Sequence, residues 1–255
     1  MKDQYDPVDW TPIIERAFFV RLRELLGSEA IQERPSDPAG ERPADPAGEG
    51  PDSTAAERPV EDLVRDRLAE LEVRWRPLVA NPMDAANLRF TALAVAVYDV
   101  LAPVSGAAGA AAVAEDCLNA PLRADILAGT REVLDRAGDA FAALVAVSKE
   151  RERSYFGPSF RFERPVDDHD SYVLDVRRCL FHEALVAAGR EELQPVLCRF
   201  DLNWADAIEP ARHDLRFVRP VTFASGSTCR MLFTRVERVP GPRAGGAGLR
   251  ESAHG

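Results

Sequence analysis

The sequence has no surplus of basic residues. It contains 32 Lys and Arg residues against 42 Asp and Glu residues, which gives a formal net charge of −10. A protein that binds nucleic acid without regard to sequence needs a basic surface, because it must displace the counterions of the phosphates. The acidic balance therefore argues against a nucleic-acid partner, although it identifies no substrate.

The chain also lacks the pattern of a secretory leader and any long apolar run. Its first ten residues, MKDQYDPVDW, are rich in acidic side chains and have no apolar core, unlike a signal peptide. The longest apolar stretch, residues 90–104, is too short to cross a bilayer and contains Asp99 and Pro103, so we expect a buried helix there. We therefore expect a cytoplasmic protein with no membrane partner. The oligomeric state is not predicted by this sequence.

Cysteine is scarce, with four residues in 255. In a reducing cytoplasm, cysteines are more often thiols, metal ligands or small buried residues than halves of disulfides. Cys117 lies late in an Ala-rich stretch, and we expect it in the core. Cys179, Cys198 and Cys229 all fall within the last hundred residues, beside polar side chains. These three are the first candidates for chemistry.

The N-terminal half has the spacing of amphipathic helices. Thr11 and Pro12 are typical of a helix start, and Gly27 is typical of a helix end. Tandem octapeptides follow, ERPSDPAG and ERPADPAG, and such Pro- and Gly-rich repeats cannot bury a core. Residues 28–57 are therefore predicted to be a disordered linker. Apolar residues then recur at helical spacing, which predicts helices over residues 60–75, 83–101, 105–118 and 121–149.

The C-terminal half combines strands with short helices. Alternation of apolar and polar residues predicts strands at 160–163, 172–176, 215–218 and 229–236, with helices over 178–188 and 191–206. Pro220 cannot donate to a ladder, so its strand is expected at an edge or with a bulge. Because strands and helices are segregated, we predict an α+β fold, an N-terminal helical bundle packed on a C-terminal antiparallel sheet with two short helices. The expected units are a first helix, the linker, a helical region, an α+β catalytic domain and a disordered tail, at residues 1–27, 28–57, 58–150, 151–238 and 239–255.

The spacing around Cys179 is that of a reactive site on a helix. His182 and Glu183 follow it at i+3 and i+4, so the three side chains are expected on one helix face. We expect Cys179 in the first turn of a helix that begins at the end of a strand. The positive end of the helix dipole favours a thiolate there.

Two further cysteines, Cys198 and Cys229, have neighbours in the sequence that are typical of a functional site. Asp201 follows Cys198 at i+3, with Trp204 close behind, and Cys229 comes shortly after Gly226, where a glycine allows close backbone approach. Each residue also has a plainer interpretation. Cysteine is often buried as a small apolar residue, His182 can be a surface histidine, and Asp201 can cap a turn. Spacing alone does not choose between these alternatives.

The order of these residues resembles that of a known enzyme family. The strings are Arg178-Cys179-Leu-Phe-His182-Glu183, Leu197-Cys198-Arg-Phe-Asp201, Leu215-Arg216-Phe217-Val218-Arg219 and Gly226-Ser-Thr-Cys229-Arg-Met-Leu-Phe233. Together, from about residue 160 to 236, they resemble the L-2-amino-thiazoline-4-carboxylic acid hydrolase family. The sequence departs from the family pattern where Arg219-Pro220-Val221-Thr222 replaces an Arg-Thr step, and where Gly226 precedes Cys229 by three residues rather than four.

The resemblance implies a hydrolase that acts on a non-peptide C–N bond of a small cyclic amidine or amide, such as 2-aminothiazoline-4-carboxylate, without a cofactor. Cys179 would attack C2 of the ring, with His182 as base and later as acid. Asp201 or Glu183 would pair with the amidinium. The implied catalytic residues are Cys179, His182, Glu183, Cys198, Asp201 and Cys229, and the implied substrate-binding residues are Arg178, Arg199, Trp204 and Gly226.

Other functions use the same atoms. Cys179, His182, Cys198 and Cys229, with Asp201 nearby, are a plausible ligand set for zinc. An enzyme of the same fold recruited to a ring-forming or rearrangement step in secondary metabolism is a second alternative. A sensor that binds a metal or another ligand at the cysteines is a third. Whether the three sulfurs converge in space is the observation that separates chemistry from core packing.

Overall fold

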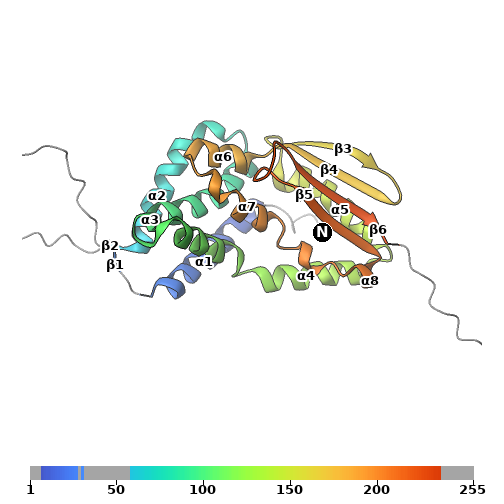
Figure 1. Ribbon diagram of the computed structural model, residues 1–255, viewed down its shortest axis with the longest axis horizontal. Helices are drawn as coiled ribbons and strands as arrows, with labels where there is room; N and C mark the ends of the chain where they lie inside the picture. The colour runs from blue at the N-terminus through green and yellow to red at the C-terminus, as the bar shows by residue number, and fades with distance from the viewer. Residues whose placement is uncertain (1–6, 28–29, 32–57, 237–255) are drawn as a thin grey trace, which may run out of the picture.

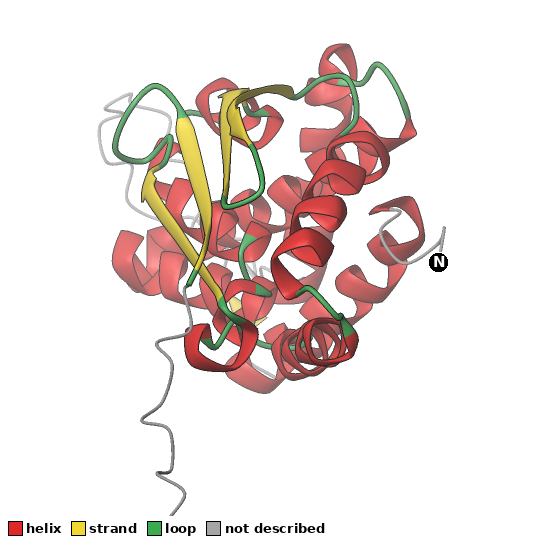
Figure 2. Cartoon of the chain, turned by 90° about the vertical axis from the view of Figure 1, so that its right-hand side faces the viewer, coloured by secondary structure: helices red, strands yellow, loops and turns green. Residues whose placement is uncertain are grey.

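The computed structural model describes residues 7–27, 30–31 and 58–236. Most of the helices lie on one side of the molecule, and the antiparallel sheet lies on the other with further helices beside and below it (Figure 1), which confirms the predicted α+β fold. From the sheet side, the strands lie over part of the helical layer (Figure 2). The predicted linker and tail, 28–57 and 239–255, lie outside the described residues, except that Ala30–Ile31 (β1) pairs with Arg58–Pro59 (β2).

The first two helices pack on the third. Helix α1 (Pro7–Leu26) ends at Gly27 (φ 61°), as predicted, but begins before Thr11 and carries Pro12 inside it. Trp10 packs against the core, and this contact favours extension of the helix beyond the expected cap. Helix α2 (Val60–Trp75) has the predicted bounds, and its buried face is Val60, Val64, Leu68, Leu71 and Trp75. The 3₁₀ turn η1 (Arg76–Leu78) follows it.

Helix α3 (Pro82–Asn119) is the central helix of the bundle. The two helices predicted here are joined into one element with a kink at Gly106, whose backbone is non-helical. Among the described helices, α3 alone is long and apolar enough to cross a membrane, and 56% of its most apolar 18-residue window is buried inside the protein. Its buried side chains belong to the hydrophobic core.

The kink at Gly106 gives a stability prediction. Its φ of 73° and ψ of 162° are accessible to glycine alone, and a Cβ at this position would contact nothing within 4 Å. Gly106→Ala should therefore lower the free energy of unfolding by about 1–3 kcal/mol through backbone strain rather than a clash. Gly138, which has no positive φ and equally open surroundings, is the control. Urea unfolding of both Ala variants measures the difference, and equal stabilities would contradict the strain.

The single helix predicted over 121–149 is wrong, because the structure has two. Helix α4 (Arg123–Arg136) ends at Ala137, whose backbone is extended, and α5 (Ala140–Arg151) begins after Asp139. The Asp139 carboxylate accepts a hydrogen bond from the Ala142 N–H (3.0 Å) and pairs with Arg235 of the sheet (2.9 and 2.6 Å). A cap and an ion pair to a distant strand therefore outweigh the continuous apolar pattern. Helix α5 continues as a π-helical turn, η2 (Glu152–Phe156).

Four strands form the sheet in the order β3-β4-β6-β5, with all neighbours antiparallel. Pro220 lies on the edge strand β5, within a register shift between Val218 and Val221, so both expectations for it are confirmed. The strands are β3 (Arg161–Asp167), β4 (Ser171–Arg178), β5 (Leu215–Val221) and β6 (Cys229–Arg235).

Short helices connect the strands and pack on the bundle. Helix α6 (Leu180–Ala188) ends at Gly189 (φ 67°), as predicted, and α7 (Gln194–Asp201) follows the turn η3 (Glu191–Leu193). Both helices contact α3. The turn η4 (Ala205–Ala207) and helix α8 (Pro210–His213) then lead into β5. One hydrophobic core runs from Phe18 in α1 to Phe233 in β6, so the bundle and the sheet share it.

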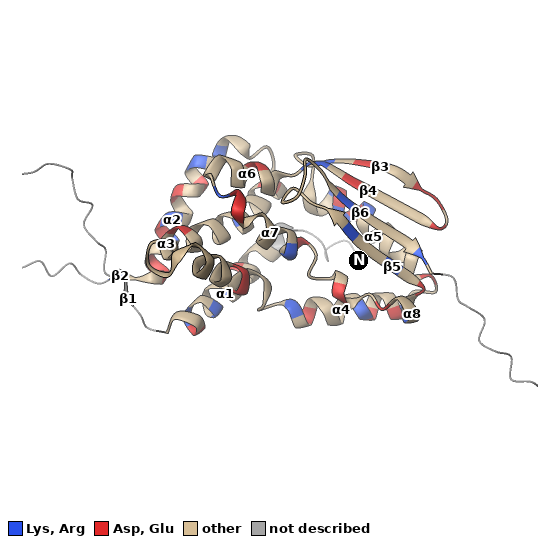
Figure 3. Ribbon diagram, viewed as in Figure 1, with Lys and Arg blue, Asp and Glu red and all other residues tan. Residues whose placement is uncertain are grey.

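Strands β3, β4 and β6 between them carry both acidic and basic residues (Figure 3). Asp175 on β4 is fully buried and pairs bidentately with Arg230 on β6 (2.6 and 2.7 Å). Arg177 bridges Asp175 (3.0 Å) to Glu163 on β3 (2.7 Å). The hydrogen bonds from Arg230 hold the pKa of Asp175 below its ordinary value.

This cross-strand pair predicts a pH-dependent stability. A depressed carboxyl pKa in the folded state stabilises above the unfolded pKa and is lost as pH falls. Asp175→Asn should lower the free energy of unfolding by ~2 kcal/mol at neutral pH. The difference from wild type should shrink as the pH falls below about 4, because the Asp175 carboxyl of the unfolded chain takes up a proton first and that of the folded chain only at lower pH. Urea unfolding at neutral pH and below about pH 4 measures this difference in the free energy of unfolding. Glu163→Gln, at a more exposed carboxylate, is the control. A gap that is unchanged in acid would contradict this origin.

Candidate active site

A cavity of about 490 Å³ lies between the sheet and helices α1, α4, α5 and α7. Alternate residues of β4 and β6 point into it, as expected for one face of a sheet: Leu174 and Val176 from β4, and Cys229, Met231 and Phe233 from β6. Most of the remaining lining side chains are also apolar. A mostly apolar concave site with a few polar groups is typical of small-molecule binding.

All three candidate cysteines line this cavity. Cys179 lies directly after β4, Cys198 lies on α7, and Cys229 is the first residue of β6. Cys229 is the register partner of Val176, three residues before Cys179, so the pairing of β4 with β6 brings two of the thiols to the same end of the sheet. The three cysteines thus border one cavity.

Two of the cysteines, Cys179 and Cys229, have raised pKa values. Burial raises the pKa of Cys179 far above its ordinary value, against the opposing effect of the His182 backbone N–H. Burial also raises the pKa of Cys229 to about 12, although Arg219 opposes it. Cys179 is the cap residue before α6 rather than a member of its first turn. The expected thiolate at a helix start is therefore wrong for the empty site, because desolvation outweighs the helix end.

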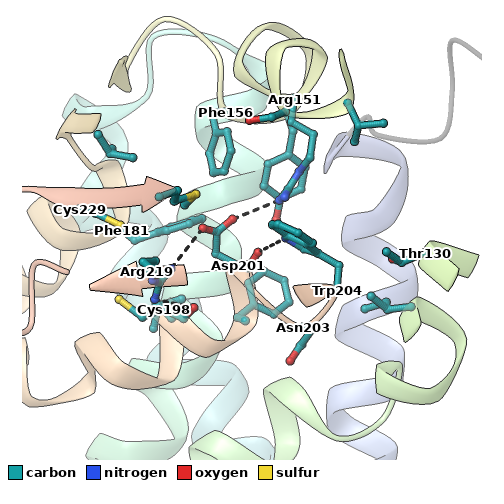
Figure 4. A pocket seen from close by; sticks show the side chains of 18 of the residues that line it. Thr130, Arg151, Phe156, Phe181, Cys198, Asp201, Asn203, Trp204, Arg219 and Cys229 are labelled. Carbon is teal, nitrogen blue, oxygen red and sulfur yellow. Dashed lines mark hydrogen bonds and ion pairs between the residues drawn. The ribbon is translucent and has the colours of Figure 1, made fainter. Parts of the chain in front are cut away.

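Two arginines flank one carboxylate at the cysteine end of the cavity (Figure 4). Asp201 lies 3.1 Å from an Nη of Arg151 on α5 and 3.7 Å from an Nη of Arg219 on β5. Arg219 also donates to the carbonyl oxygen of Cys198 (3.0 Å). The three charged side chains are only 16%, 10% and 9% exposed, for Arg151, Asp201 and Arg219 in turn. One carboxylate thus balances one of two guanidinium charges in a largely apolar space.

The sequence comparisons identify the family. The profile of the L-2-amino-thiazoline-4-carboxylic acid hydrolase family matches residues 86–233, more than half of the chain. The chain belongs to this hydrolase family. The match begins inside α3, far ahead of the resemblance detected from about residue 160. No curated protein matches the sequence, and no solved structure matches the fold.

The His182 side chain is connected to Cys198 of this hydrolase-family site, whereas its backbone N–H acts on Cys179. Its Nδ1 lies 2.8 Å from the side-chain oxygen of Gln194, and the Gln194 amide donates to the sulfur of Cys198 (3.3 Å). The imidazole stacks on Phe223 (4.9 Å between centroids) and does not line the cavity. Gln194 lines the cavity and was missed by the sequence analysis, although its i, i+4 spacing to Cys198 is a helical contact.

Trp204 lines the cavity, as predicted, and its indole N–H donates to the backbone oxygen of Asp201 (2.8 Å). Its ring packs on Phe217 (5.0 Å between centroids). Arg151 and Arg219 are the cavity-lining arginines, and sequence analysis proposed neither as a ligand for the substrate. Arg219 stands in the string that resembles the family, which was the available signal. Arg151 lies in a helix with no motif around it.

Besides His182, four predicted residues lie away from the cavity lining. Glu183 and Arg178 form an exposed bidentate ion pair with each other (2.6 and 2.8 Å). Arg199 is exposed, with Glu115 and Asp206 at 3.8 and 3.7 Å. Gly226 lies in the exposed turn between β5 and β6, where a Cβ would approach Val221 at 3.2 Å. These four residues lie at the surface rather than in the cavity lining.

The zinc alternative remains a prediction. Cys179, Cys198 and Cys229 line the cavity. The His182 side chain does not line it and is hydrogen-bonded to Gln194. Within the part of the chain that the structure describes, no three His, Cys, Asp or Glu side chains are grouped closely enough to hold a metal ion. The arrangement seen here is three thiols around a cation-rich cluster rather than a coordination sphere.

The raised thiol pKa values predict slow alkylation. The thiolate is the reactive form of cysteine. In variants that keep Cys179 or Cys229 as the single cysteine, reaction with iodoacetamide at pH 8 should be at least about tenfold slower than in the urea-unfolded chain. The rate should continue to rise through pH 10, because these thiols ionise late. Mass spectrometry of samples quenched at successive times measures the alkylation rate, and equal rates in folded and unfolded chains would contradict the prediction.

Proposed function

We propose that this chain hydrolyses a non-peptide C–N bond in a small cyclic amidine or amide of the 2-aminothiazoline-4-carboxylate type, by cysteine-based catalysis. Family membership supports hydrolysis. The observation that carries the cysteine assignment is the convergence of Cys179, Cys198 and Cys229 on one cavity beside Asp201. We further propose a cytoplasmic location, where the four free cysteines would remain reduced.

The proposed reaction forms and breaks one covalent bond to the enzyme. A cysteine thiolate attacks C2 of the ring and forms a C–S bond, after which the C2–N bond breaks and the ring nitrogen takes a proton. Water then attacks C2, and the enzyme sulfur leaves with its electron pair. The cysteine returns to its starting state, so the balance needs water alone as co-reactant.

Cys179 is the proposed nucleophile. Its thiol is protonated in the empty site because burial raises its pKa. A cationic amidinium next to a buried thiol favours the thiolate, so the substrate itself would activate the attacking sulfur. Cys198 is the second candidate, because the hydrogen bond from Gln194 holds its sulfur and connects it to His182. The recruited-enzyme and sensor alternatives stay predictions.

Serine substitution distinguishes the cysteines. Cys179→Ser should lower kcat for aminothiazoline carboxylate hydrolysis by at least about 10³-fold, because serine is far less nucleophilic in this apolar site. Cys117→Ser is the matched control, because Cys117 is buried in α3 and does not line the cavity. Ring opening is measured by release of free amine, with circular dichroism as the check of folding. Full activity of folded Cys179→Ser with loss in Cys198→Ser would transfer the role to Cys198. Full activity of folded Cys179→Ser, Cys198→Ser and Cys229→Ser would refute cysteine catalysis.

A further inference from the structure

We infer that the substrate is an amphipathic carboxylate. Arg151 and Arg219 would hold its acid group, and an apolar group much larger than the aminothiazoline ring would lie between α1 and α4. This inference rests on the proposed function, since it defines the substrate class of the same cavity.

The charge distribution supports an anionic group. Asp201 balances only one of the two guanidinium groups around it. Burying an unbalanced charge is costly unless a partner is present, and guanidinium matches carboxylate geometry in bidentate pairs. Arg151 also lies over the ring of Tyr155 (4.6 Å), which fixes its orientation. The other acidic residue of the lining, Asp125, is exposed on α4 and so is well hydrated. A substrate carboxylate completes the balance.

The size of the cavity supports an additional apolar group. At about 490 Å³, the space has the volume of pockets that bury drug-sized ligands. The acid group, the amidine and the three thiols occupy only its cysteine end. Most of the remaining wall is apolar and includes side chains of α1 (Trp10, Ile13, Ile14) and α4 (Ile126, Val133), with Asp125 and Thr130 also on α4. A single small ring would leave these walls in contact with water.

The two ends lie on different sides of the cavity. Figure 4 shows Thr130 of α4 across the cavity from Cys198 and Cys229, with Asp201 and Trp204 between them. On the α1–α4 side Ile13 is 49% exposed, so this end reaches solvent. An acid group at the arginines would therefore place the apolar group toward the opening.

Gly129 provides a steric probe of the apolar end. It lines the cavity on α4, and a Cβ built on it meets nothing within 4 Å. The Cβ of a leucine therefore fits at this position, and a helical position tolerates leucine better than glycine. Ala128 is its exposed neighbour on the same helix and offers a matched control.

The test uses naphthylacetate and its neutral analogue naphthylacetamide, with binding measured by isothermal titration calorimetry. The wild type should bind the acid at least tenfold more tightly than the amide. Arg219→Gln and Arg151→Gln should remove this preference while amide binding continues, which also shows that the variants are folded. Gly129→Leu should weaken both ligands at least tenfold, and Ala128→Leu should change neither. If an arginine variant fails to fold, Arg219→Lys and the wild-type ratio decide.

Equal affinity for acid and amide in the wild type would overturn the anionic assignment. Unchanged binding in Gly129→Leu, or no binding of either ligand, would overturn the apolar group. The proposed function fails separately. Naphthylacetate binding without hydrolysis of any aminothiazoline carboxylate would refute the hydrolase proposal and leave the ligand class intact. Hydrolysis without an acid–amide preference would do the reverse.

Discussion

The cluster of Arg151, Asp201 and Arg219 is the constraint on which the site depends. It joins the end of α5, the end of α7 and the edge strand β5 at the cysteine end of the cavity. Loss of the carboxylate would leave two like charges with little hydration, and loss of either arginine would leave a single pair. Buried ion pairs are weak evidence of stabilisation, because desolvation cancels much of their attraction. We therefore interpret this cluster as a binding feature that the fold accommodates.

The apolar surroundings that confine this cluster also set the state of the thiols. Burial raises the pKa of Cys179 and Cys229, and the nearby Arg219 opposes this effect at Cys229 without cancelling it. The same low dielectric strengthens the attraction between an arginine and a substrate acid group. Under the proposed function, a ligand with both an acid group and an amidinium would satisfy the arginines and activate the sulfur in one binding event. Water carries neither the negative charge that would balance the arginines nor the positive charge that would activate the sulfur.

Local patterns predicted local structure well. The bounds of α2 follow from its own apolar spacing. Pro220 has no N–H to donate, and it lies at a register shift on the edge strand β5. The break between α4 and α5 depends on Asp139 pairing with Arg235, a contact across 96 residues that no periodicity contains. The site divides in the same way. The order of motifs in the family indicated the cysteines. Helical spacing predicted that the His182 side chain acts on Cys179, but in the structure it is hydrogen-bonded to Gln194, which is hydrogen-bonded to Cys198. Arg151 and Arg219 are brought to the same carboxylate only by the packing of the sheet on the helices.

The division between matched and unmatched segments separates chemistry from selectivity. Every described residue that lines the cavity lies within 86–233, except Trp10, Ile13 and Ile14 of α1. The thiols, the arginines and Asp201 thus come from the part of the chain that follows the family pattern. The wall at the opening comes partly from a helix outside it. A reaction can be retained while such a wall changes, because the described part of α1 adds Trp10, Ile13 and Ile14 to the lining and none of the thiols, arginines or Asp201. Differences in the apolar part of the substrate are therefore expected to depend on α1, and the acid group and reaction on the matched segment.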